Sequence, residues 1–247
     1  MGWEAHFALT SPPMDFHTEL LPEVLPPEPL IVVGRWLDEA WRLRHQPNPN
    51  SMVVATVGDG GDLSARVVLC KDLVPQPGYL VFYTNYHSRK GQQLAEHPRA
   101  AAVIHWDHLH RQVRIEGPVV TAPAEESDAY FASRPWQSRI GAWASQQSEP
   151  VNSREQLVAA VDAATKRFGV TEPWQANTGP GIQKVAGDPI IPRPPHWGGY
   201  RLWAEKVELW VEGAGRIHDR ARWSRTLTKR ADGSFETGHW SAARLQP

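Results

Sequence analysis

Three side chains able to take part in catalysis stand at alternate positions near the C-terminus, in the segment GRIHDR at 215–220. On a strand, Arg216, His218 and Arg220 would share one face and form a row roughly 13 Å long. Cationic or near-cationic groups in such a row repel one another unless an anion lies opposite, so the pattern favours an anionic ligand. The alternative is a solvated polar face on which Asp219 supplies the counter-charge.

A second candidate anion site lies in the segment YTNYHSRKG at 83–91. A strand that ends in Tyr83 and Thr84 is followed by a helix whose first turn carries Arg89 and Lys90. Free N–H groups at a helix N-terminus attract anions, whereas two cations there oppose the helix dipole unless an anion is bound. This conflict favours a phosphate-like ligand. The alternative is a pair of surface side chains whose charged ends reach solvent.

Three further segments carry weaker patterns. Arg66 and Lys71 stand five apart in ARVVLCK, which on a regular strand places them on opposite faces. One ligand could then meet both only across a bulge or at the end of the strand. Taken alone, the pattern favours the alternative that both are solvated residues flanking an apolar run. The segment RQVRIEG at 111–117 alternates polar and apolar residues, as a half-exposed strand does. The histidines of HWDHLH at 105–110 suit a turn between strands, and we predict no metal site.

Composition limits the ligand to a local site. The chain has 247 residues, with 26 Lys and Arg against 27 Asp and Glu and a formal net charge of −1. Without a chain-wide basic field we expect neither a nucleic-acid partner nor a membrane surface. A single cysteine, Cys70, excludes an internal disulfide, and no secretory leader or long apolar run is apparent. We therefore expect a soluble, cytoplasmic protein.

No catalytic set that could act unaided stands out. The sequence shows no Ser–His–Asp order, no paired catalytic carboxylates and no nucleophile elbow. A bound cofactor is therefore expected to supply the reactive group.

Short strands separated by helices predict a β-barrel with peripheral helices, mainly β in class, rather than a parallel α/β sheet. Residues 1–28 are rich in Pro and acidic residues and are expected to form an arm that is flexible unless it docks. Residues 29–247 are expected to form a single domain with a Pro/Gly-rich loop insertion at about 170–190. Helices are expected within 27–46, 88–98, 123–135 and 152–169. Strands are expected within 51–57, 63–71, 79–85, 100–106, 111–122, 196–213, 216–225 and 239–247, the first two forming a hairpin around GDGGD.

Seven segments in order resemble the pyridoxine/pyridoxamine 5'-phosphate oxidase family. They are SARVVLCK, VFYTNYHSRKG, RQVRIEGPV, SDAYFASRP, IGAWASQQS, PRPPHWGGYRL and GRIHDR. The resemblance extends from about residue 35 to the C-terminus, apart from the loop near 170–190. It implies an FMN-binding split β-barrel, assembled as a homodimer with FMN at the subunit interface.

The resemblance also implies a role for each matching residue. The substrate phosphate would be held by Lys71, Tyr130, Arg134 and Ser138. Arg216 and His218 would be the catalytic pair, lying over the substrate's pyridine ring. Gln147 and Ser148 would reach the flavin from the partner subunit, along with Trp210 and Arg220. The full set of implied FMN-binding residues is Arg66, Val67, Val68, Leu69, Cys70, Lys71, Tyr83, Thr84, Arg89, Lys90, Gln112, Gln147, Ser148, Trp210 and Arg220.

On this resemblance we expect oxidation of pyridoxamine or pyridoxine 5'-phosphate to pyridoxal 5'-phosphate, with O2 as acceptor and hydrogen peroxide as product. Two alternatives are a related FMN oxidase of phenazine biosynthesis and a non-catalytic flavin- or pyridoxal-phosphate-binding protein. Trp136 and Val211 stand where the family pattern leads us to expect polar residues. Retention of the six implied substrate-binding residues favours the phosphorylated pyridine.

Overall fold

The computed structural model describes residues 19–170 and 189–247. The α-helices are α1 (Pro29–Leu43), α2 (Arg89–Glu96), α3 (Ala124–Ser133), α4 (Trp136–Ala144) and α5 (Arg154–Arg167). The strands are β1 (Ser51–Val57), β2 (Leu63–Leu69), β3 (Asp72–Val74), β4 (Tyr79–Asn85), β5 (Arg99–Trp106), β6 (Arg111–Thr121), β7 (Trp197–Trp203), β8 (Lys206–Val211), β9 (Asp219–Ser224), β10 (Leu227–Lys229), β11 (Phe235–Thr237) and β12 (Ser241–Leu245).

One antiparallel sheet forms the body of the molecule, with strand order β12-β9-β8-β6-β5-β1-β2. The long strand β6 leaves this order half-way along: residues 111–116 pair with β8, and residues 119–121 pair with β7. Gly117 lies at the change, where a Cβ atom would come within 1.9 Å of the Trp203 carbonyl oxygen. Strand β7 pairs in turn with β4, so the sheet curls into a half-barrel. This confirms the predicted fold class.

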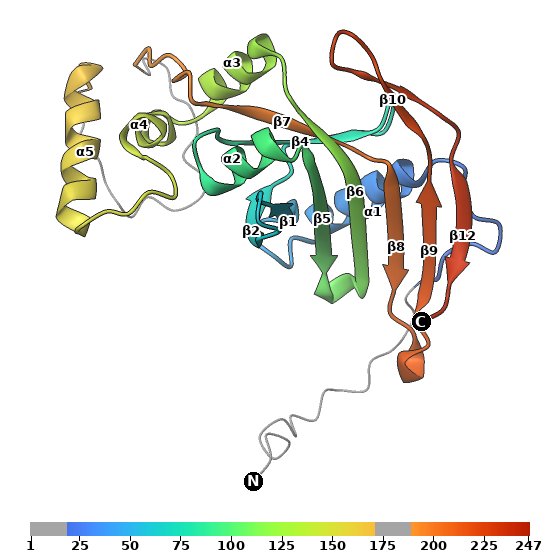
Figure 1. The fold of residues 1–247 in the computed structure, drawn as a ribbon. Coiled ribbons are helices and arrows are strands. Elements are labelled where there is room, and N and C mark those ends of the chain that lie inside the picture. Colours follow the sequence, from blue (N-terminus) through green and yellow to red (C-terminus); the bar gives the residue numbers. More distant parts are fainter. Residues whose placement is uncertain (1–18, 171–188) are drawn as a thin grey trace.

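Helix α1 covers one face of the sheet (Figure 1). Its buried residues Val33, Trp36 and Ala40 join a core made by alternate residues of the strands, among them Val54 and Ile115. The opposite face of the same strands carries partly exposed side chains in this chain. The sheet therefore has one packed face and one open face, and the candidate residues of β6, β8 and β9 lie on the open one.

A second apolar cluster joins α3, α4 and α5 to the start of β7. Figure 1 shows α4 and α5 at the opposite end of the molecule from β9 and β12. Ser153 caps α5 as its spacing predicts, because its hydroxyl accepts a hydrogen bond from the Gln156 backbone N–H at 3.2 Å. Helix α4, which follows Pro135 directly, was not predicted from the sequence.

The hairpin around GDGGD is confirmed, since β1 and β2 pair in antiparallel register from Ser51 with Leu69 to Val57 with Leu63. The strand expected over 216–225 is wrong in its first half. Arg216 ends a turn of 3-10 helix and has a positive φ of 65°, and β9 begins at Asp219. Arg216, His218 and Arg220 therefore do not form a row on one strand.

The expected N-terminal arm docks over its described part. The Leu21 N–H donates to the Asp219 carboxylate at 2.9 Å, and the Trp223 indole N–H donates to the Pro26 carbonyl at 2.8 Å. Leu21 is buried in the main core. Leu21 and Pro26 thus lie against β9, which is the docked case that the expectation allowed for. Residues 1–18 of the arm and 171–188 of the predicted loop insertion lie outside the described residues.

Candidate active site

A cavity of about 730 Å³ opens where β2, β4, α2, α3 and α4 meet. Four of its lining residues are cationic, namely Arg66, Lys71, Lys90 and Arg134, and none of the described lining residues is acidic. Twelve of the residues proposed from the sequence line it: Arg66, Val67, Val68, Leu69, Lys71, Tyr83, Thr84, Lys90, Tyr130, Arg134, Ser138 and Gln147. An uncompensated group of cations around a cavity of this size suits an anionic ligand.

Lys90 lies buried at the start of α2, among oxygen acceptors. Its Nζ donates to Thr84 Oγ1 at 3.0 Å, to Ser88 Oγ at 3.1 Å and to Gln147 Oε1 at 2.7 Å. Burial, and secondly the charge of Arg66, lower the pKa of Lys90 to about 8. Among the residues that the structure describes, no carboxylate pairs with this amine, so an anion in the cavity would restore its protonated form.

Ser88 fixes where α2 begins. Its hydroxyl caps the helix by accepting from the Gly91 backbone N–H at 3.4 Å, and it donates to the Asn85 carbonyl at 2.7 Å. A Cβ atom at Gly91 would lie 2.0 Å from the Tyr86 carbonyl oxygen, so only glycine fits there. Arg89, the other predicted cation of this turn, is exposed and does not line the cavity.

Arg66 and Lys71 do reach one cavity, because β2 ends at Leu69 and Lys71 follows outside the strand. The direction of the Lys71 side chain is therefore not set by the alternation of side chains along β2. The Arg66 guanidinium donates to Thr56 Oγ1 at 2.7 Å and to the Val54 carbonyl at 3.2 Å. Cys70 between them is buried and does not line the cavity; burial raises the pKa of its thiol to about 12.

Stacked aromatic rings form one wall of the cavity. Tyr83 stacks on Tyr130 at 4.0 Å between ring centroids and on Trp197 at 5.5 Å. The Arg134 guanidinium lies 4.7 Å from the Trp197 ring centroid, and its buried Nη1 has no hydrogen-bond partner among the described residues. Burial lowers the pKa of Arg134. A buried guanidinium with an unsatisfied donor is the kind of group that an oxyanion would complete.

Gln147 and Ser148, which the resemblance assigned to the flavin of the partner subunit, contact the β4–α2 turn of their own chain. Besides receiving the Lys90 bond, Gln147 Oε1 accepts from the Thr84 hydroxyl at 3.0 Å. The Arg89 backbone N–H donates to Ser148 Oγ at 3.2 Å, and Ser148 has a positive φ of 78°. The segment that follows α4 therefore folds back over the start of α2.

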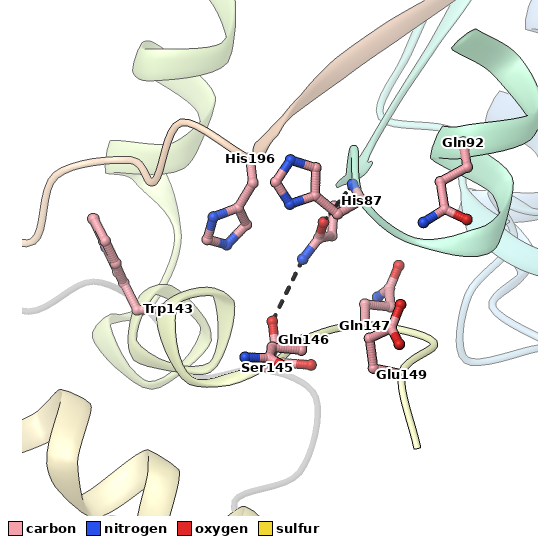
Figure 2. Close-up of a pocket in the computed structure, with 9 residues that line it drawn as sticks. His87, Gln92, Trp143, Ser145, Gln146, Gln147, Glu149 and His196 are labelled. Atoms are coloured by element: carbon pink, nitrogen blue, oxygen red, sulfur yellow. Dashed lines mark hydrogen bonds between the residues drawn. The ribbon is translucent and has the colours of Figure 1, made fainter. Parts of the chain in front are cut away.

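A smaller cavity of about 490 Å³ is lined by residues 145–147 of this segment together with residues of β4, α2 and the segment just before β7 (Figure 2). Figure 2 shows the His87 and His196 rings side by side, and Gln147 nearer to Gln92 than to His196. The centroids of the two histidine rings are 5.6 Å apart. The Asn85 amide donates to the Ser145 carbonyl across the opening at 3.4 Å. Gln147 lines both cavities, so it forms part of the wall between them.

The remaining candidate residues form a second group on the open face of the sheet. Gln112, Trp210 and Arg220 lie opposite one another on β6, β8 and β9. The His218 ring lies 4.6 Å from the Trp210 ring, and its Nδ1 accepts from the Gly213 N–H at 3.3 Å. Neutral His218 therefore carries its proton on Nε2. None of these residues, nor Arg216, lines the large cavity.

Some residues of the site were missed from sequence. Asn48, Pro135 and Trp197 line the cavity, and Glu126 accepts from the Tyr83 hydroxyl at 3.3 Å. Trp197 follows His196 inside a segment that the sequence analysis had quoted, so its aromatic character was the available signal. The histidines of 105–110 lie around the turn between β5 and β6, and within 19–170 and 189–247 no three His, Cys, Asp or Glu side chains form a metal-binding group.

Comparison with known proteins identifies the family. Residues 38–168 match the family described as pyridoxamine 5'-phosphate oxidase. Residues 197–247 match the region described as the pyridoxine 5'-phosphate oxidase C-terminal dimerisation region. The chain belongs to the pyridoxamine 5'-phosphate oxidase family. The resemblance inferred from the seven segments is thereby confirmed, and the family supports an oxidoreductase.

Curated relatives in this family carry the same name. A pyridoxine/pyridoxamine 5'-phosphate oxidase of Burkholderia lata is 46% identical over 220 residues, covering 89% of this chain and 89% of that protein. Another, from Gloeothece citriformis, is 46% identical over 223 residues, covering 90% of this chain and 89% of that protein. The similarity thus extends over nearly the whole of each family member.

Two solved structures of this family share the fold. PhzG from Burkholderia lata, in complex with tetrahydrophenazine-1-carboxylic acid, is 27% identical with a TM-score of 0.72 and covers 92% of this chain and 100% of that one. A pyridoxamine 5'-phosphate oxidase-related, FMN-binding protein from Nostoc punctiforme has a TM-score of 0.59 at 14% identity, covering 91% and 99%. In the described part of this chain, no helix has the length and apolar character needed to cross a membrane.

Proposed function

We propose that this protein is an FMN-dependent oxidase that converts pyridoxamine 5'-phosphate or pyridoxine 5'-phosphate to pyridoxal 5'-phosphate, with O2 as the acceptor and hydrogen peroxide as a product. The observation that carries the proposal is the 730 Å³ cavity, in which four cations without a described acidic neighbour border a stacked aromatic wall. Two aromatic ligands that each carry a phosphate match both properties.

The residues present fit FMN at the β4–α2 end of the cavity. Lys90 is a buried amine without a carboxylate partner, and Thr84 and Ser88 add hydroxyls beside it. Arg66 lies on the neighbouring strand and lowers the pKa of Lys90 through its charge. These groups would hold the cofactor phosphate, with β2 backbone from Val67 to Leu69 along the flavin.

The substrate phosphate is assigned to the α3–α4 side. Lys71, Tyr130, Arg134 and Ser138 line this part of the cavity, and Lys71 Nζ lies 5.8 Å from the Tyr130 ring centroid. The unsatisfied Nη1 of Arg134 makes it the strongest donor available there. The face of the Trp197 ring would hold the Arg134 guanidinium in place through a cation–π contact.

A homodimer would complete the site. Gln112, Trp210 and Arg220 lie on the open sheet face, away from the cavity lining of their own chain. Residues 197–247, which carry two of the three, match the family's dimerisation region. We infer that this face of one protomer contributes to the cavity of its partner.

When bound, FMN supplies the hydride acceptor that oxidation of an amine or alcohol carbon requires. The chain's own part is to orient the substrate and to stabilise charge. Arg216 and His218 are assigned to this task, with Nε2 of His218 as the donor that its Nδ1 contact leaves available. The aromatic wall and Arg134 would hold the pyridine within reach of the acceptor.

The alternative is an oxidase of the phenazine type, which the likeness to PhzG supports. A tricyclic carboxylic acid would use the aromatic wall but needs no phosphate site. The cations Lys71 and Arg134 at the substrate end therefore favour the phosphorylated pyridine.

The test is peroxide release by the purified protein, which we expect to be yellow. Pyridoxamine 5'-phosphate should support turnover, whereas unphosphorylated pyridoxamine should require about ten- to a hundredfold higher concentrations, since it lacks the charge-assisted contacts. The variant Arg134→Met should lose most of that preference. Turnover of a dihydrophenazine carboxylic acid without turnover of either pyridine would support the alternative. FMN binding without any turnover would indicate a carrier.

A further inference from the structure

Glu208 is a buried carboxylate on the open face of the sheet, outside every residue role proposed above. Only 7% of the residue is exposed, although its position on β8 points away from the core. Two guanidinium groups cover it, from Arg114 on β6 and from Arg220 on β9. A carboxylate in this state is costly to bury unless its partners hold it in a defined geometry.

The contacts of Glu208 fix one arginine more strongly than the other. Its Oε1 accepts from both Nε and Nη2 of Arg220, at 3.3 and 2.8 Å. Its Oε2 accepts from Nη1 of Arg114 at 3.3 Å. Arg222 lies directly opposite Glu208 in the register of β8 and β9, yet Glu208 bonds to the diagonal neighbour Arg220. The pairing is therefore selective.

Arg220 makes one further hydrogen bond, to the backbone near the C-terminus. Its Nη1 donates to the Gln246 carbonyl at 3.0 Å. A guanidinium has five N–H donors in a rigid plane, and three of them are occupied by Glu208 and Gln246. The remaining two, one on each terminal nitrogen, have a set direction. Residue 220 lies in register with Trp210, and through it with Gln112, on the face proposed to meet the partner's flavin.

We propose that Glu208 is a positioning residue for the cofactor, acting through Arg220 and orienting its two remaining N–H donors toward FMN. This rests on the proposed function, which assigns Arg220 to the flavin. A purely electrostatic influence of Glu208 would have the opposite sign, because a negative charge opposes the binding of an anionic cofactor. Removing the charge then distinguishes positioning from electrostatics by the direction of the change.

The experiment is fluorescence titration of the unliganded protein with FMN, at fixed salt, for Glu208→Gln and for a matched variant. Positioning predicts that Glu208→Gln raises the Kd for FMN about tenfold, because the charge-assisted pair that holds Arg220 is lost. The matched variant is Glu116→Gln. Glu116 lies on the same face and pairs with Arg114 and Lys206 without contacting Arg220. Its Kd should stay within about twofold of the wild type.

A double-variant cycle shows whether the effect passes through Arg220. Arg220→Met should raise the Kd, and adding Glu208→Gln to it should weaken binding no further. Because the double variant removes both charges of the pair together, it stays testable even if Glu208→Gln alone fails to fold. Thermal unfolding of each unliganded variant reports folding separately.

The outcomes separate the two proposals. An unchanged or lower Kd in folded Glu208→Gln overturns the positioning role while leaving the proposed function intact. Additional weakening in the double variant also overturns it, since Glu208 would then act independently of Arg220. A wild-type protein that binds no FMN overturns both.

Discussion

Lys90 is the buried amine to which the proposed function assigns the FMN phosphate. Its three acceptors are neutral oxygens, so burial is not offset by an opposite charge and the pKa falls to about 8. The amine is protonated below that pH and loses its charge above it. Phosphate binding and protonation of Lys90 are therefore linked.

We predict that FMN affinity decreases as pH rises through about 8, and that Lys90→Met abolishes this dependence while weakening binding about ten- to a hundredfold at pH 7. Stability of the unliganded protein should respond in the opposite sense. The unfolded chain, with a lysine pKa of about 10.4, binds the proton more tightly, so the free energy of unfolding rises with pH between the two pKa values. Flavin titration and urea unfolding across pH 7–10 measure both trends; parallel trends would contradict the assignment.

Arg216 and Arg220 are expected to act on different ligands. Arg216 lies in the turn before β9 and Arg220 lies within it, so their side chains leave the backbone from different elements. Arg216→Met should spare FMN binding and lower kcat/KM for pyridoxamine 5'-phosphate about ten- to a hundredfold, whereas Arg220→Met should chiefly raise the Kd for FMN. Steady-state kinetics at saturating FMN, beside flavin titration, separate the two. Equal loss of FMN in both variants would show that the division is wrong.

Among the elements, the turn from β4 into α2 has a tight steric requirement next to the cavity. Ser88 caps the helix, Gly91 packs against the Tyr86 carbonyl, and Lys90 between them extends toward Thr84. Any side chain at position 91 must displace this turn and the amine with it.

We predict that Gly91→Ala lowers the free energy of unfolding by about 2–4 kcal/mol and weakens FMN binding. Gly141→Ala in α4 is the matched control, because a Cβ there meets nothing within 4 Å. In a helix interior that change should stabilise by roughly 0.5–1 kcal/mol. Thermal and denaturant unfolding of both variants test the pair. A Gly91→Ala protein as stable as Gly141→Ala would mean that the turn relaxes without cost.

At the scale of the whole molecule, the open sheet face divides into an apolar and a charged half. Val53, Val67 and Val103 lie opposite one another on β1, β2 and β5, while the ion pairs of Glu208 and Glu116 lie on β6, β8 and β9. Val67 is 65% exposed and Val53 is 40% exposed in this chain. Contiguous exposed valines beside a selective charge network are typical of a surface that meets a partner.

We predict that Val53→Asp shifts the protein from dimer to monomer and weakens FMN binding with it, because a buried unpaired carboxylate opposes association. Leu157→Asp on α5 is the control, since Leu157 is also 40% exposed but lies on a helix far from this face. Light scattering gives the mass and flavin titration the affinity. A dimeric Val53→Asp protein with normal affinity would exclude this face as the interface.

Sequence reasoning was accurate for several elements whose signals are local, though it missed helix α4 and the turn at 214–216. Helix α2 and its Ser88 cap, the hairpin of β1 and β2, and the capped helix α5 follow from residue spacing and capping chemistry, which act within a few residues. The order of seven segments was specific enough to indicate the family, because many independent matches in register are rare by chance. Of the cavity's cations, Lys90 was indicated by its position at a helix N-terminus, whereas Arg66, Lys71 and Arg134 were assigned through the resemblance.

Tertiary structure decided what depends on long-range packing. Whether Arg66 and Lys71 line one cavity depends on where β2 ends. Whether Gln147 contacts Lys90 of its own chain depends on how the segment after α4 folds back. Arg216 does not lie on the strand, because the backbone turns sharply between Gly213 and Ile217. The turn is so close that a Cβ atom at position 213 would come within 1.8 Å of the Ile217 carbonyl oxygen. The sequence alone determined which residue types could bind two phosphates. Only the fold decided their grouping, into a cavity and an open face, because that grouping is set by pairings between strands far apart in the chain.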